Sequence, residues 1–217
     1  MAVGRAVEAV RLAADQVHEA GEVLGGICAE DPLWAYVVPD GAKRTRQAMV
    51  KVGRALVEHG RRAGEVYATP HPIDGVAIWL PPESPLGEAR RSVRWAALAA
   101  GVGLGAAGIA RSVRALGAMD RARRRGVPER HWQLLVLGVI ASQRRRGIGS
   151  ALLAPVLARA DAEGVECAVA CLEPRGVLFF RRHGFEVVGD EDLPGAGPRV
   201  WMMRRKAGAV GWAGRSL

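Results

Sequence analysis

The segment from Leu137 to Leu153 constrains the fold more than any other part of the chain. An apolar run predicts a buried strand over Trp132–Ile140, and this run leads directly into a glycine-containing turn that opens a helix over Gly147–Glu163. Successive backbone N–H groups at such a helix start converge on an anion, and the helix dipole favours negative charge there. Gly147 and Gly149 let a ligand approach the backbone closely. The segment therefore predicts a binding site for a pyrophosphate group.

Three arginines in this turn, Arg144, Arg145 and Arg146, add charge-assisted donors for phosphate oxygens. The segment is not a P-loop, because the Gly-Lys-Ser/Thr ending is missing, and its glycines do not have the Gly-x-Gly-x-x-Gly spacing of a dinucleotide site. That spacing does occur at Gly103–Gly108, but a helix-forming alanine run precedes it instead of a strand. A packed helix rich in small residues explains Gly103–Gly108 better than a dinucleotide site does.

The rest of the pattern predicts an α/β fold with a mixed sheet and helices on both faces. We expect helices over 15–28, 42–62, 147–163 and 177–183, two more between 87 and 125, and strands over 9–12, 65–68, 75–80, 132–140, 166–172, 185–188 and 199–204. The Asp31-Pro32 pair is expected to break the first helix. The expected organisation is one domain over 1–206, with a basic helical insert at about 84–130 and a flexible tail at 207–217.

Two motifs carry a resemblance to a known family. Arg144-Arg-Arg-Gly-Ile-Gly149 matches the Gln/Arg-x-x-Gly-x-Gly/Ala signature of the GNAT superfamily of acyl-CoA N-acyltransferases, and Phe179-Phe-Arg-Arg-His-Gly-Phe185 resembles its Phe-Tyr-x-x-x-Gly-Phe segment. Nearly the whole chain is similar to the puromycin N-acetyltransferase-like actinobacterial members, in segments that include Asp31–Trp34, Gly75–Pro82, Ala158–Gly164 and Pro198–Trp201. The resemblance implies the GNAT fold, a mostly antiparallel twisted sheet whose fourth and fifth strands splay apart.

The resemblance also implies acetyl-CoA, or coenzyme A, as the cosubstrate. Backbone amides from Arg145 to Ser150 would hold the pyrophosphate, and Val139 with its neighbours would pair through the main chain with the pantetheine arm. The expected cosubstrate-binding residues are Leu137, Gly138, Val139, Arg144, Arg145, Arg146, Gly147, Ile148, Gly149 and Ser150. No metal is expected, because Cys167 and Cys171 lack the further ligands that a zinc site needs.

The catalytic groups depart from the family pattern. Phe180 stands where the family commonly has a tyrosine that protonates the leaving thiolate, and Ala170 stands where it has a glutamate. Three explanations remain open. Water alone protonates the thiolate, or Cys171, Glu173 or Tyr36 has taken over the acid or base role, or the chain binds acyl-CoA without transferring its acyl group or catalyses a different reaction. His131 and His183 are expected to be structural or surface residues.

The positive charge is concentrated in one segment. The chain has a formal net charge of +9, and residues 90–130 hold ten arginines against Asp120 and Glu129. This basic insert is interpreted either as a solvated face, as a site for an anionic ligand, or as a contact with nucleic acid or anionic lipid. Trp95 is its only aromatic residue, which weakens the single-strand nucleic-acid interpretation. Nucleic acid is not required to explain the arginines of the glycine turn, since a pyrophosphate explains them.

The remaining features favour a cytoplasmic protein. Three cysteines are too few for a disulfide framework, and the first residues show no signal-peptide pattern. The most apolar stretch, 96–110, is shorter than the roughly twenty residues that span a membrane, so no transmembrane segment is expected. We therefore expect a monomeric or homodimeric N-acyltransferase that moves an acyl group, most simply acetyl, to a small-molecule amine. The competing hypotheses are a CoA-binding homologue with altered chemistry and a basic module that contacts nucleic acid or membrane.

Overall fold

The computed structural model describes residues 7–39, 45–84 and 105–211, and the structural statements below concern these ranges. Seven strands form one sheet in the order β1-β2-β3-β4-β5-β7-β6. Their bounds are β1 Val10–Arg11, β2 Glu65–Ala68, β3 Gly75–Leu80, β4 His131–Val139, β5 Glu166–Cys171, β6 Glu186–Asp192 and β7 Arg199–Arg205. Only β4 and β5 are parallel, and every other neighbouring pair is antiparallel. The predicted mixed, mostly antiparallel sheet is confirmed.

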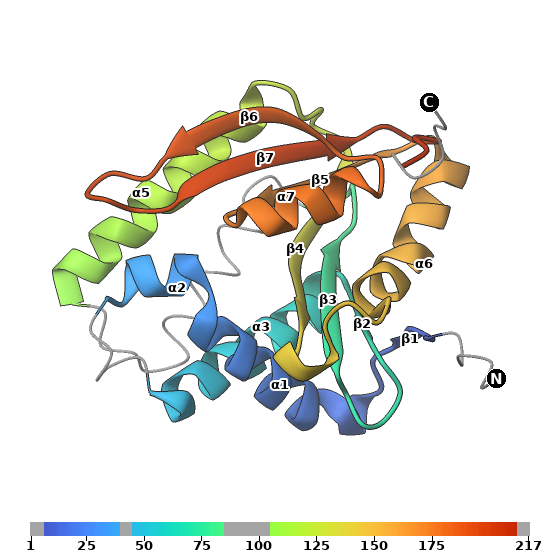
Figure 1. Cartoon of the computed structure of the whole chain (residues 1–217), viewed down its shortest axis with the longest axis horizontal. Helices are drawn as coiled ribbons and strands as arrows, with labels where there is room; N and C mark the ends of the chain where they lie inside the picture. The colour runs from blue at the N-terminus through green and yellow to red at the C-terminus, as the bar shows by residue number, and fades with distance from the viewer. Residues whose placement is uncertain (1–6, 40–44, 85–104, 212–217) are drawn as a thin grey trace.

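Helices cover both faces of the sheet (Figure 1). They are α1 Val17–Glu30, α2 Pro32–Val37, α3 Arg46–Ala63, α5 Gly105–Arg124, α6 Ile148–Glu163 and α7 Pro174–Arg181, with short 3-10 turns η1 Ala14–Gln16 and η2 Ala141–Gln143. Strand β3 is buried on both faces of the sheet. Because successive side chains of a strand point to opposite faces, it contributes to the core on each side. Val76 and Ile78 pack in the core beneath α1 and α3, whereas Ala77 and Trp79 pack in the core beneath α6.

Asp31 and Pro32 end the first helix, as predicted, and they also begin a second helix that the sequence did not predict. Oδ1 of Asp31 accepts hydrogen bonds from the backbone N–H of Leu33 at 2.8 Å and of Trp34 at 3.4 Å. An aspartate at the N-cap followed by proline in the first turn is a strong helix start. The extra helix α2 turns the chain so that Asp31 lies at the junction of α1 and α2.

Helices α1 and α3 cross at glycines. A Cβ atom at Gly53 would lie 2.2 Å from the carbonyl oxygen of Gly21 and 2.4 Å from the nitrogen of Gly25. The backbones of the two helices are therefore in direct contact, with no side chain between them. This contact sets the position of α1 and of the α1–α2 junction that follows it.

Arginines of the basic insert form ion pairs with acidic residues of the same chain. Arg121 donates through Nε to Glu191 of β6 at 2.7 Å, and Arg125 lies 3.5 Å from the same carboxylate and donates to the carbonyl oxygen of Asp190 at 2.8 Å. The other described pairs join Arg123 and Arg124 to Asp120, and Arg130 to Glu83. One predicted helix of the insert lies outside the described residues. None of the helices that the structure describes is long and apolar enough to cross a membrane.

The residues that follow β7 are held against α6. Arg205 is buried and donates to both carboxylate oxygens of Asp161, at 2.5 and 2.8 Å, which holds the pKa of that carboxyl below its usual range. The N–H of Gly208 donates to Asp161 at 2.7 Å, and the carbonyl oxygen of Ala209 accepts from Arg205 at 2.9 Å. The first residues after the sheet are thus anchored to the body of the protein.

Candidate functional site

Strands β4 and β5 pair over four rungs and then separate. The last rung joins Leu134 to Val169. Directly after it, Leu135 forms a bulge, because Ile78 and Trp79 of β3 pair with the residues on either side of it. A bulge bends its strand and increases the local twist. Strand β4 therefore turns away from β5 where their pairing ends, and Figure 1 shows β6 and β7 running across the direction of β3 and β4. The predicted splay of the fourth and fifth strands is confirmed.

The separation leaves part of β4 open on one side. Residues Leu135–Val139 continue the strand beyond its last rung with β5, while their other edge remains paired with β3. An open strand edge can accept an extended ligand through main-chain hydrogen bonds. Main-chain groups alternate between the two edges of a strand, so of the predicted contacts Leu137 and Val139 face the open edge, whereas the main-chain groups of Gly138 face β3. The edge fits the peptide-like arm of coenzyme A.

The turn after β4 has the backbone geometry of an anion site. Gly147 is the N-cap of α6 with φ 83°, and Arg145 has φ 65°, so both lie in the left-handed region. Turns of this kind direct successive N–H groups into one concavity. The N–H groups of Ile148, Gly149 and Ser150 belong to the first turn of α6, so they have no acceptor inside the helix. The loop fits the pyrophosphate that the sequence predicts.

Replacing Gly147 with alanine is expected to weaken acetyl-CoA binding about tenfold. A Cβ atom in the left-handed region costs about 1–2 kcal/mol, and relief of that strain would move the N–H groups of the loop. Titration calorimetry with acetyl-CoA measures the change. Gly164→Ala is the matched control, since Gly164 ends the same helix with φ 66° but lies away from the loop. Equal effects of the two substitutions, or none for Gly147→Ala, would contradict the assignment.

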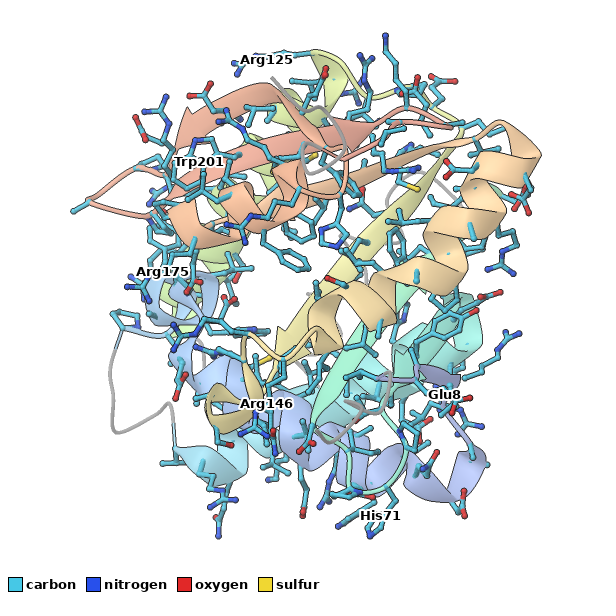
Figure 2. The ribbon with its side chains drawn as sticks, turned by 45° about the vertical axis from the view of Figure 1, so that its right-hand side comes forward. Glu8, His71, Arg125, Arg146, Arg175 and Trp201 are labelled. Carbon is cyan, nitrogen blue, oxygen red and sulfur yellow. The ribbon has the colours of Figure 1, made fainter. Side chains whose placement is uncertain are left out.

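The three arginines of the turn do different things. Arg144 donates through Nε to the carbonyl oxygen of Val139 at 3.1 Å and through Nη2 to Glu30 at 3.4 Å, which ties the loop to α1. Arg145 and Arg146 are exposed and have no ion pair within the described part of the chain. Arg146 extends outward from the loop (Figure 2). Arg145 and Arg146 are thus the side chains of this triplet that remain available to phosphate oxygens.

The hydroxyl of Ser150 is engaged with His183, which joins α6 to α7. Nδ1 of His183 lies 3.0 Å from the carbonyl oxygen of Phe179, and Nε2 lies 2.9 Å from Oγ of Ser150. Because a carbonyl only accepts, Nδ1 carries a proton, and in the neutral ring Nε2 accepts from the hydroxyl. Ser150 can therefore offer a ligand its backbone N–H, while its side chain holds the two helices together.

A cavity of about 430 Å³ opens at the fork between β4 and β5. Its walls come from α1, α2, α3, α5, β4 as far as Leu137, the end of β5 and α7, and most are apolar. The size is that of a site for a small molecule. At the fork end the cavity is lined by Asp31, Cys171, Glu173 and Phe180. This end adjoins the open edge of β4, where the thioester of a bound acyl-CoA would lie.

Two carboxylates lie at the fork end. Oδ1 of Asp31 caps α2, and its Oδ2 has no partner among the described residues. Burial raises the pKa of Asp31 and the charge of Glu173 raises it further, while the two capping N–H groups act in the opposite direction. The pair can attract a cation, and Asp31 is a better proton acceptor than an exposed aspartate. An ammonium group is the natural ligand of this arrangement.

Cys171 ends β5 beside these carboxylates. Its thiol is buried and donates to the carbonyl oxygen of Glu173 at 3.2 Å. Burial raises the pKa of the Cys171 thiol, and the charges of Glu173 and Asp31 act in the same direction. The thiolate is the nucleophilic form of cysteine, so this environment disfavours an acyl-cysteine intermediate. Cys171 serves as a small wall residue of the cavity.

Phe180, which replaces the family tyrosine, and the remaining candidate Tyr36 are placed differently. Phe180 is buried and lines the cavity, and its ring packs against Phe179 and Phe185 with centroids 5.2 and 5.5 Å apart. Tyr36 is also buried but does not line the cavity, and a Cβ atom at Gly197 would lie 2.7 Å from its ring. The structure brings Cys171 and Glu173 together at the fork, and it places Tyr36 beneath the turn between β6 and β7.

Asp31 was missed as a functional residue by the sequence reasoning. The available signal was the Asp-Pro pair, which predicts an N-cap and therefore a carboxylate held at a defined point. Nothing in the local pattern places that carboxylate opposite the end of β5, because the two segments are far apart in the chain. Within the described residues, no group of three or more potential metal ligands occurs.

Known proteins resemble this chain in sequence and fold. The family model described as "Acetyltransferase (GNAT) family" matches residues 65–185. A solved structure described as histone acetyltransferase HPA2 and related acetyltransferase, from Corynebacterium glutamicum, is 22% identical, with a TM-score of 0.62 over 94% of this chain and 97% of that one. Arylalkylamine N-acetyltransferase 2 from Aedes aegypti is 11% identical, with a TM-score of 0.64 over 94% and 100%. An agmatine N-acetyltransferase is 18% identical, with a TM-score of 0.63 over 93% and 100%.

One curated relative matches only a short piece. A Dictyostelium discoideum protein described as a probable serine/threonine-protein kinase is 36% identical over 78 residues, which is 35% of this chain. The match spans 11% of the length of that relative. The kinase description belongs to that larger protein and says nothing of the chemistry at the fork.

Proposed function

Because the chain belongs to the GNAT family of acetyltransferases, we propose that it transfers an acetyl group from acetyl-CoA to a primary amine of a small molecule. The observation that carries the proposal is the cavity at the β4–β5 fork, where Asp31 and Glu173 lie beside the open edge of β4. The pyrophosphate loop lies at the end of the same strand. Cosubstrate and acceptor therefore meet where β4 and β5 separate.

The carboxylates bind the acceptor as an ammonium ion and prepare it for attack. Asp31 takes one proton through Oδ2, which leaves a neutral nitrogen with a lone pair. That nitrogen attacks the thioester carbon, so that a C–N bond forms and the C–S bond breaks. The nitrogen loses a second proton, and one of the two protons goes to the thiolate sulfur. The products are an N-substituted acetamide, free coenzyme A and one proton released to solvent.

The remaining groups orient the reactants and exclude water. The open edge of β4 from Leu135 to Val139 aligns the pantetheine arm, and the first turn of α6 holds the pyrophosphate. Phe180 and Cys171 form an apolar wall at the reacting end. Since Phe180 has no proton to give, water or the protonated Asp31 supplies the proton that the thiolate takes up.

Two narrower assignments are part of the proposal. Within the family, the segments Asp31–Trp34 and Pro198–Trp201 support a puromycin N-acetyltransferase-like member. The three cysteines, all free and buried, support a reducing, cytoplasmic location. Puromycin, agmatine and an arylalkylamine therefore belong in the first panel of acceptors.

The test is release of free thiol from acetyl-CoA in the presence of that amine panel. We expect thiol release with at least one amine and thermal stabilisation by coenzyme A alone. Stabilisation by CoA without thiol release for any amine or acyl chain would instead indicate a CoA-binding homologue. Absence of stabilisation would contradict the loop assignment. Salt-dependent retention on DNA that CoA does not alter would indicate a nucleic-acid-binding module.

A further inference from the structure

We propose that the far end of the cavity is a second recognition subsite, which binds a hydroxyl group of the acceptor between Arg123, His131 and Gln133. The proposal rests on the proposed function, because the subsite would hold the other end of the amine that is acetylated at the fork. The acceptor class that it predicts is a long primary amine with an apolar body and a terminal hydroxyl, an ω-amino alcohol.

The two ends of the cavity are separated along the sheet. Cys171, at the fork end, lies three residues beyond Ala168, which pairs with Gln133. It lies five residues beyond Glu166, which pairs with His131. At about 3.3 Å per residue, the far end is roughly 10–17 Å from the fork end. An amine that fills the cavity must bridge this distance with its body.

The wall of the cavity favours an apolar body. Leu24 of α1, Leu56 of α3, and Leu116 and Met119 of α5 all line it. These side chains offer no hydrogen bond, so a polar chain would lose its water without compensation. Polar groups of the acceptor are therefore expected only at its two ends.

At the far end, the hydrogen bonds of His131 and Gln133 define their orientation. Nδ1 of His131 lies 2.7 Å from the carbonyl oxygen of Pro128, so Nδ1 carries a proton. The amide nitrogen of Gln133 donates to the carbonyl oxygens of Leu134 at 2.9 Å and Ala168 at 3.3 Å. Since both of these are acceptors, Oε1 of Gln133 must be the atom that faces His131.

Two acceptor atoms consequently face each other. Burial lowers the pKa of His131, and the positive charge of Arg123 lowers it further. The hydrogen bonds of the ring raise the pKa, but the effect of burial is larger. The ring is therefore neutral at pH 7, and its Nε2 carries a lone pair. Nε2 of His131 lies 3.3 Å from Oε1 of Gln133, with no hydrogen to share between them. A donor hydrogen from a bound ligand would satisfy both atoms.

Arg123 supplies the complementary donors. Its side chain is only 17% exposed and lines the cavity, and among the described residues its ion pair is with Asp120, through Nη2 at 3.2 Å. A guanidinium group has five N–H donors, so most of them remain for a ligand. Asp120 is also bound by Arg124 at 3.0 Å, which leaves it poorly placed to hold a second ammonium group.

A hydroxyl matches these requirements because it can accept and donate at once. It would accept from Arg123 and donate to His131 or Gln133. A second ammonium could not accept from Arg123, and a carboxylate could not donate to the two acceptors. The subsite therefore favours a hydroxyl over the apolar end of a plain alkylamine.

The test compares ω-amino alcohols of six to twelve carbons with n-alkylamines of matched length, by thiol release from acetyl-CoA. The wild-type protein is expected to favour the amino alcohol in kcat/KM by about tenfold or more at one chain length. Arg123→Met should abolish this preference while leaving the rate with the matched alkylamine within about twofold. Arg123→Lys should restore part of it. Arg114→Met is the matched control, since Arg114 is exposed on the same helix outside the cavity.

Three outcomes would overturn the inference. The wild type could show no preference for the hydroxyl, Arg123→Met could retain the preference, or Arg114→Met could lose it equally. If no amine of any class is acetylated, the proposed function fails separately. In that case calorimetry of the same amine pairs with CoA-loaded protein tests the hydroxyl subsite. Equal affinities for the amino alcohol and the alkylamine would overturn the inference.

Discussion

Asp31→Asn is expected to lower kcat/KM for amine acetylation by about 10²–10⁴-fold while the fold and the affinity for acetyl-CoA stay unchanged. Asparagine is as good an N-cap as aspartate, so it keeps the hydrogen bonds to the N–H groups of Leu33 and Trp34. It cannot take a proton from an ammonium group. Steady-state thiol release measures the loss, and titration calorimetry with acetyl-CoA tests that the other half of the site is intact.

The pH dependence of the wild type follows from the raised pKa of Asp31. Asp31 must be ionised to accept a proton, so kcat/KM is expected to fall as the pH is lowered through that pKa, above the value near 3.9 of an ordinary aspartate. The pH dependence of stability has the opposite sign to that of kcat/KM. Between the unfolded and folded pKa values the folded protein binds more protons, so the free energy of unfolding decreases as the pH rises. Asp31→Asn is therefore expected to be at least as stable as the wild type at pH 7.

Asp15→Asn is the matched control, because Asp15 is exposed in the turn η1 and does not line the cavity. It should leave both kcat/KM and stability unchanged. An Asp31→Asn protein with wild-type kcat/KM would remove Asp31 from the mechanism. A variant that loses activity together with stability or acetyl-CoA affinity would show that the carboxylate has a structural role instead.

Gly53→Ala is expected to lower the free energy of unfolding by about 3 kcal/mol. The added Cβ atom would lie 2.2 Å from the carbonyl oxygen of Gly21, and a backbone atom cannot rotate out of the way. Helix α1 must shift, and it carries Leu24, Ile27 and Cys28 to the cavity wall. Urea unfolding followed by circular dichroism measures the stability, and a raised KM for the amine would report the displaced wall.

Gly26→Ala provides the control for this second substitution. Gly26 lies on α1, but a Cβ atom there would have no neighbouring atom within 4 Å. Alanine is the better helix former, so Gly26→Ala is expected to raise stability by about 0.5–1 kcal/mol. If Gly53→Ala were as stable as Gly26→Ala, the direct backbone contact between α1 and α3 would be wrong.

Local patterns in the sequence predicted most of the elements because those patterns have local causes. The alternating residues of Glu65–Ala68 and Gly75–Leu80 gave strands with the bounds that the structure has, and a continuous apolar run gave β4 within one residue at either end. Helix α2 was not predicted, because Asp31-Pro32 suits both the end of one helix and the start of the next. A helix of six residues has too little periodicity to be detected.

The ion-pair partners of the basic segment could not be predicted from local sequence patterns. Residues 90–130 looked like an unpartnered basic segment, yet Arg121 and Arg125 pair with β6, which is remote in sequence. In Figure 2 Arg125 lies at the top of the view and Arg146, in the turn between β4 and α6, lies well below it, so the two arginine clusters are separate in space as well. The pairing partner of an arginine depends on which strand lies beside its helix, and composition carries no information on that.

The sequence by itself determined the geometry of the turn between β4 and α6, since a strand, left-handed residues such as Gly147 and a helix start are adjacent in the chain and are set by backbone sterics. Only the tertiary structure determines which side chains lie beside the open edge of β4, the strand that leads into this turn. The bulge at Leu135 separates β4 from β5, and the glycine contact of α1 with α3 brings Asp31 to the end of β5 beside Glu173. These juxtapositions depend on packing between segments that are distant in the chain, which no local pattern encodes.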